Sequence, residues 1–159
     1  MMNRKIAVAA VAALASALLT IPVFVAAQQP PSRADNLVKY RKAMYTVMYN
    51  NFASLGGMVA GRAPFDAKAA QTRAERVAYM SLMIGSDAFL PESAEGTPTK
   101  AKPAIFTDRA EFDRLLGAWQ KAAATLAKEA KSGKLEKIKP AFGATKDACD
   151  TCHKKFKED

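Results

Sequence analysis

Beyond residue 28, apolar positions recur at spacings of three and four residues in four separate stretches of the chain, with polar residues between them. This periodicity is typical of amphipathic helices that bury one face. No stretch shows a convincing period of two, which a half-buried strand requires. The four expected helices span residues 32–59, 66–88, 108–133 and 135–157. The pattern therefore predicts an all-α fold.

Glycine and proline separate these helices. Gly61 and Pro64 follow the first helix and Gly133 follows the third, so short links are expected to make each pair of neighbours antiparallel. A longer connection joins the second helix to the third and carries four residues that favour turns: Pro91, Gly96, Pro98 and Pro103. Pro140 lies inside the fourth helix, where we expect an irregular first turn or a kink. Four helices of this length suggest a single bundle.

The first residues of the chain have the pattern of an export signal. Arg4 and Lys5 precede an apolar run over residues 6–25, and small residues follow it. The run is long enough for an uncleaved membrane anchor, but Pro22 and the small residues favour cleavage after Ala27. The predicted division is a cleaved signal peptide, residues 1–27, and one exported domain, residues 28–159. We expect a periplasmic protein without stable membrane insertion.

The run Cys149-Asp150-Thr151-Cys152-His153 is the attachment pattern of a c-type haem. Cys149 and Cys152 would form thioethers with one covalent haem, and His153 would bind the iron from the same helical face. His153 is the one histidine of the chain, so a bis-histidine iron is excluded. A structural disulfide, a redox-active dithiol and half of a zinc site are the alternatives. Zinc would need further ligands, and a thioredoxin-like dithiol belongs to a βαβ context.

Several motifs together resemble the class II c-type cytochromes, most closely the cytochrome c′ family. The motifs are the ending Cys149-x-x-Cys152-His153-x-x-Phe156-Lys157, then Ala141-Phe142-Gly143, Val38-Lys39-Tyr40-Arg41-Lys42-Ala43 and Gly61-x-x-Pro64-Phe65-Asp66. The resemblance implies a left-handed, antiparallel four-helix bundle that pairs as a homodimer through its first two helices. It also implies that the protein binds NO and CO and can transfer one electron.

The resemblance also identifies the residue over the open face of the haem. In the family this residue lies four positions after the arginine of the first helix, which here makes Tyr45, after Arg41, the distal residue. Low-spin relatives carry a ligand methionine there, whereas Met44 is one residue off, about 100° around a helix. We expect a high-spin, five-coordinate iron. The alternative is a low-spin electron carrier with Met44 as sixth ligand.

Three further residues are expected near the haem by the same resemblance. Arg41 is the candidate partner of a haem propionate, and its alternative is a solvated surface arginine. Lys157 stands four residues after His153, where the family usually has arginine, and Phe156 stands where tyrosine is frequent. Lysine lacks the guanidinium fork, and phenylalanine can pack on the haem edge but cannot donate a hydrogen bond.

The net positive charge of the chain suggests an acidic binding partner but does not identify it. Removing residues 1–27, which contain Arg4 and Lys5, lowers the formal charge from +9 to +7. Eight lysines of the C-terminal half would form a basic collar that steers an acidic periplasmic redox partner: Lys128, Lys131, Lys134, Lys137, Lys139, Lys154, Lys155 and Lys157. The alternative is an ordinary helical surface with excess charge. Without a recognition motif or a distal proton donor, neither nucleic-acid binding nor catalysis is expected.

Overall fold

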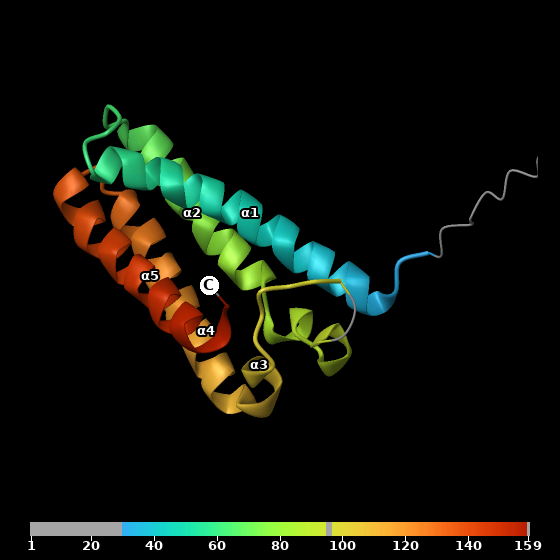
Figure 1. The fold of residues 1–159 in the computed structure, drawn as a ribbon. Coiled ribbons are helices and arrows are strands. Elements are labelled where there is room, and N and C mark those ends of the chain that lie inside the picture. Colours follow the sequence, from blue (N-terminus) through green and yellow to red (C-terminus); the bar gives the residue numbers. More distant parts are fainter. Residues whose placement is uncertain (1–29, 95–96, 159) are drawn as a thin grey trace, which may run out of the picture.

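The computed structural model describes residues 30–94 and 97–158, and the predicted signal peptide lies outside them. Four long helices form an antiparallel bundle (Figure 1). They are α1 (Arg33–Val59), α2 (Ala67–Met83), α4 (Arg109–Ala130) and α5 (Leu135–Phe156). The connection between α2 and α4 contains two short 3₁₀ turns, Ser86–Ala88 and Pro91–Ala94, and one short helix, α3 (Ala104–Thr107). The described residues contain no strand, which confirms the all-α prediction.

The first two long helices start with side-chain caps. The Asp35 N–H donates to Ser32 Oγ at 3.1 Å, and the Ser32 N–H donates to Asp35 Oδ2 at 3.2 Å. These reciprocal bonds form a capping box, which satisfies two donors at the start of α1. Asp66 caps α2 by accepting from the Ala69 N–H at 2.9 Å. The short links turn at Gly61 and Gly133, whose φ angles of 70° and 66° favour glycine.

The second helix is shorter than its apolar pattern predicts. It ends at Met83 rather than near Ala88, so that boundary of the prediction is wrong. Apolar residues remain buried beyond the end, at Ile84, Ala88 and Phe89, because the chain turns back onto the core instead of leaving it. Two carbonyls of this turn accept from Arg109: Nη1 donates to Phe89 O at 2.9 Å and Nη2 to Ser86 O at 2.8 Å.

The fourth long helix is continuous through Pro140. Its first turn is tight, because the N–H groups of Lys137 and Ile138 both donate to Lys134 O, at 3.1 and 3.2 Å. Pro140 lies on the exposed side of α5. The helix thus accommodates a residue that lacks an N–H donor without being interrupted.

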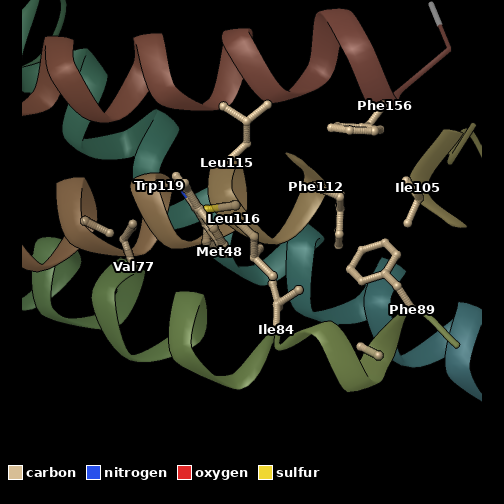
Figure 2. Packing of buried hydrophobic residues seen from close by; sticks show 12 residues of the cluster. Met48, Val77, Ile84, Phe89, Ile105, Phe112, Leu115, Leu116, Trp119 and Phe156 are labelled. Carbon is tan, nitrogen blue, oxygen red and sulfur yellow. The ribbon is translucent and has the colours of Figure 1, made fainter. Parts of the chain in front are cut away.

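The core divides into two clusters along the bundle. The turn-end cluster lies near the α1–α2 and α4–α5 turns and consists of Leu55, Ala70, Ala74, Leu126, Ala130, Ile138 and Ala141. The connection-end cluster lies toward the α2–α4 connection (Figure 2) and consists of Met48, Val77, Ile84, Ala88, Phe89, Ile105, Phe112, Leu115, Leu116, Trp119, Ala123 and Phe156. Phe52 packs against both clusters and stacks on Phe142 with ring centroids 4.2 Å apart. No described helix is long and apolar enough to cross a membrane.

Candidate haem site

The two cysteines lie in the last two turns of α5, where both are free thiols and half-buried. Cys149 and Cys152 pack against the connection-end cluster. Burial raises the pKa of Cys149 to about 11 and also raises the pKa of Cys152. Reactive dithiols have depressed pKa values and commonly sit at helix N-termini, whereas these thiols sit at a C-terminus. The site is therefore a poor redox dithiol.

The zinc alternative also fails within the described part of the chain. Residues 30–94 and 97–158 contain no group of three or more histidine, cysteine, aspartate or glutamate side chains placed to hold a metal ion. A structural zinc site needs four such ligands. Two thiols and an adjacent imidazole on one helix match the donor set of a covalent haem instead.

His153 is exposed and lines an open hollow of about 370 Å³. The other lining residues are Lys102, Asp150, Lys154, Lys157 and Glu158. Packing around the ring lowers the pKa of His153, and the positive charge of Lys157 lowers it further. A neutral imidazole is the form that binds a metal.

Arg41 is buried in the bundle, with 3% of its surface exposed. Its Nη1 donates to Ala88 O at 2.6 Å and to Ser93 Oγ at 2.7 Å, and its guanidinium carbon lies 4.6 Å from the centroid of the Phe89 ring. The alternative of a solvated surface arginine is therefore wrong. Burial lowers the pKa of Arg41, although a guanidinium this basic keeps its charge.

The second terminal nitrogen of Arg41 supports the predicted contact with a propionate. Arg41 Nη2 is buried and has no hydrogen-bond partner among the described residues. An unpaired buried charge is costly, and a carboxylate would satisfy it. This unpaired, buried donor is the observation which shows that the residues of the site suit a haem. Sequence reasoning gave no signal for Ala88 and Ser93, which hold the other half of the guanidinium.

Tyr45 reaches the same cluster from α1. It packs against the connection-end cluster, and its ring centroid lies 6.2 Å from that of Trp119. Burial raises the pKa of Tyr45, and the nearby thiols of Cys152 and Cys149 raise it further. The structure thus brings Tyr45 beside both predicted attachment cysteines and keeps its phenol protonated. Met44 also packs against this cluster.

Trp119 adds a feature that the sequence did not indicate. It belongs to the connection-end cluster, and 4% of its surface is exposed. Its Nε1 is buried without a hydrogen-bond partner in the described part of the chain (Figure 2). Trp119 and Arg41 therefore each contribute one orphaned donor at the end of the bundle that holds the thiols.

Phe156 and Lys157 end α5 differently from each other. Phe156 is buried and meets Phe112 edge-on, with centroids 5.4 Å apart at 89°. Lys157 is exposed. The backbone here pairs with the α2–α4 connection: the Lys102 N–H donates to Phe156 O at 2.9 Å and the Glu158 N–H to Lys100 O at 2.8 Å. This pairing fixes the end of the helix that carries the cysteines and His153.

The eight lysines of the predicted collar do not form one surface. Lys154, Lys155 and Lys157 flank His153, whereas the other five lie at the opposite end of the bundle. Lys139 precedes His153 by fourteen residues of one helix, about 21 Å. Carboxylates also offset the near group, since Lys155 Nζ lies 2.7 Å from Asp108 Oδ2. The collar near the haem edge is thus wrong as a single feature.

The fold and this site define a bundle-type c haem protein, in which facing helices enclose the group and the last helix attaches it. A family model described as cytochrome C′ matches residues 36–157. Cytochrome c′ of Rubrivivax gelatinosus is 38% identical over 128 residues, which cover 79% of this chain and 97% of that protein. The chain belongs to the cytochrome c′ family, whose members carry a covalently attached c-type haem.

Solved structures agree with this assignment. The crystal structure of Rubrivivax gelatinosus cytochrome c′ matches with a TM-score of 0.76 at 35% identity, over 81% of this chain and 100% of that chain. Variants of Alcaligenes xylosoxidans cytochrome c prime match with a TM-score of 0.73 at 30% identity, over 82% of this chain and 100% of theirs. One of these structures is a nitric oxide complex and another has carbon monoxide bound.

Proposed function

We propose that this chain is a periplasmic haem protein that binds NO and CO at a five-coordinate iron and exchanges one electron. The observation that carries the proposal is the position of Tyr45, a protonated side chain beside both cysteines. The family resemblance implies that a low-spin carrier would have a thioether at this position of α1. The gas complexes of the related Alcaligenes protein support the same function. Export requires that residues 1–27 act as a signal peptide.

Each residue of the site has a defined task in this function. Cys149 and Cys152 would hold the haem through thioethers, and His153 would bind its iron. Arg41 Nη2 would donate to a propionate, while Ala88 O and Ser93 Oγ keep the guanidinium oriented. Phe156 closes the apolar wall next to the cysteines, and Lys157 adds a positive charge beside His153. The haem supplies an iron that binds diatomic gases and changes oxidation state.

Tyr45 acts as a steric gate. A phenol that stays protonated is a weak ligand for iron, and its ring restricts access to the distal side. We expect Tyr45→Ala to accelerate CO association with the ferrous protein about tenfold or more, measured by flash photolysis. Met44→Leu is the matched control, because it changes the neighbouring residue and should leave the rate and the ferric spectrum unchanged. A low-spin protein that becomes high-spin in Met44→Leu would contradict the five-coordinate assignment.

The outer face of α1 and α2 supports a homodimer. Large apolar side chains are exposed there, including Val47, Tyr79, Leu82 and Met83, and the Tyr40 hydroxyl donates to Met83 O at 2.7 Å across the two helices. Large apolar side chains left exposed on two neighbouring helices are typical of an interface. Tyr79→Lys should shift the species seen in sedimentation velocity from dimer to monomer. A wild-type monomer at micromolar concentration would contradict the pairing.

A further inference from the structure

The end of the bundle far from the cysteines carries a concentrated positive charge. The α1–α2 turn and the α4–α5 turn lie together at this end (Figure 1), and a Cβ placed on Gly133 would lie 3.6 Å from the Cβ of Ala67. The basic end consists of Arg62, Lys68, Arg73, Arg76, Lys128, Lys131, Lys134, Lys137 and Lys139. Against these nine cations stand four carboxylates, Asp66, Glu75, Glu129 and Glu136, a formal excess of five.

These cations are not neutralised by ion pairs. All five ion pairs of the described residues lie outside the basic end. Two of the four carboxylates are already engaged within α2, where Asp66 caps Ala69 N and Glu75 accepts from Gln71 Nε2 at 2.9 Å. The positive field of this surface is therefore directed to solvent.

Helix stability does not account for the charges. Lysine near a helix C-terminus is favourable, and Lys128 in the last turn of α4 has that position. Lys68, Lys134 and Lys137 lie instead at the N-terminal turns of α2 and α5, where a cation opposes the helix dipole. These lysines destabilise the first turns of their helices. We therefore expect them to have a role other than stabilising the fold.

Two features of the basic end indicate what kind of partner it binds. Phe65 is exposed in the α1–α2 turn, between Arg62 and Lys68 in the sequence, with 36% of its surface accessible. An open hollow of about 290 Å³ follows it along the chain, lined by Asp66, Lys68, Ala69, Thr72, Arg73 and Arg76. Arg73 Nε has no partner among the described residues. Basic clusters with an aromatic anchor are typical of proteins that lie on anionic lipid surfaces.

The position of the surface argues against a redox protein as the occupant. A protein bound at the basic end would lie about 21 Å or more from His153, measured along α5 from Lys139. Electron tunnelling falls exponentially with distance, so exchange through this end would be slow. A membrane has no such requirement, and binding at this end leaves the site at the other end free.

We propose that the basic end binds the surface of an anionic phospholipid membrane. Lysine and arginine side chains pair with lipid phosphates, one of which fits the hollow beside Arg73, and Phe65 enters the interface. The protein lies on the membrane without crossing it. The end with the cysteines faces away from the lipid, toward gases and partners in solution.

The test is sedimentation of the haem-loaded protein with vesicles of phosphatidylglycerol and phosphatidylcholine at about 0.15 M salt, compared with phosphatidylcholine alone. We expect binding to the anionic vesicles only. The variant Lys134→Gln/Lys137→Gln/Lys139→Gln should bind up to about 100-fold more weakly, since each lysine near an anionic surface contributes about fivefold. These substitutions also remove unfavourable charges from the start of α5, so the variant is expected to fold.

The matched control is Lys39→Gln/Lys100→Gln/Lys121→Gln, which removes the same charge from exposed positions elsewhere. It should retain binding within about threefold, which would separate a local surface from the effect of net charge. Phe65→Ser should weaken binding several-fold without changing its dependence on salt. Equal losses in the two triple variants would overturn the proposal, and so would wild-type protein that ignores the vesicles. Binding to poly-L-glutamate without binding to vesicles would also overturn it, in favour of an acidic protein partner.

Discussion

The two core clusters differ in whether buried, unpaired donors accompany them. The turn-end cluster contains only alanine, leucine and isoleucine, small or aliphatic side chains that need no polar partner. The connection-end cluster is rich in aromatic residues, packs against two free thiols and lies beside the orphaned donors Arg41 Nη2 and Trp119 Nε1. A third such donor, Arg73 Nε, lines the hollow of the basic end and lies outside the turn-end cluster. Each unsatisfied buried donor costs about 1–3 kcal/mol, and more when it is charged. The connection end is therefore shaped for a group that brings polar acceptors with it.

The largest expected effect comes from removing both attachment points. Cys149→Ala/Cys152→Ala should lose all covalent haem, because no other thiol remains in the chain. Extraction with acidified organic solvent followed by the pyridine haemochrome assay measures the covalent fraction. Haem that stays with the polypeptide after extraction would show that the thioether assignment is wrong.

A substitution in the turn-end cluster is the matched control for that experiment. Leu126→Ala opens a cavity at a fully buried position and should cost about 3 kcal/mol of unfolding free energy in urea. It should leave the haem content and the absorption spectrum unchanged, since Leu126 belongs to the other cluster. Loss of haem in Leu126→Ala would mean that the two ends are not independent.

The next effect concerns the buried charge. Arg41→Met removes the two hydrogen bonds of Nη1 and the proposed bond to the propionate, so the haem-loaded protein should lose about 2–3 kcal/mol of unfolding free energy. Arg33→Met is its control in the same helix, because Arg33 is exposed and its Nη1 lies 3.4 Å from Glu92 Oε1. Exposed pairs contribute at most about 1 kcal/mol. Similar losses of unfolding free energy in the two variants would show that Arg41 does not contact the haem.

The smallest expected effect is a dependence of the unfolding free energy on pH, caused by Asp35 at the start of α1. Hydrogen bonds from Thr97 and Ser32 lower the pKa of Asp35 to about 2, from an ordinary value of 3.8. A carboxylate with a depressed pKa in the folded state contributes stability that is fully present above the ordinary value and is lost as pH falls toward 2. Urea unfolding between pH 5 and pH 2 should show this loss, and Asp35→Asn should reduce it. An identical pH profile in Asp35→Asn would contradict the role of this cap.

The sequence carried the local features of the fold and site. The apolar period located the long helices, and the cysteine and histidine spacing identified the haem pattern. These features depend on residues close together in the chain. The end of α2 was missed because burial continued at Ile84 beyond the last helical turn.

Features that depend on tertiary arrangement could not be predicted. The two oxygens that hold Arg41 come from a connection some fifty residues away in sequence, at separations of 47 and 52. The sequence predicted that the eight lysines form one collar, but the antiparallel topology places most of them at the end away from His153. Only the folded chain shows which charges share a surface.

We predict an open sixth position on the haem iron, guarded by Tyr45 at the connection end. Absorption and electron paramagnetic resonance spectra of the haem-loaded protein, ferric and ferrous, before and after addition of CO, test it most directly. We expect a high-spin signal that shifts completely with CO. A low-spin signal that does not respond to CO would contradict it, and would show that a side chain such as Met44 occupies the iron.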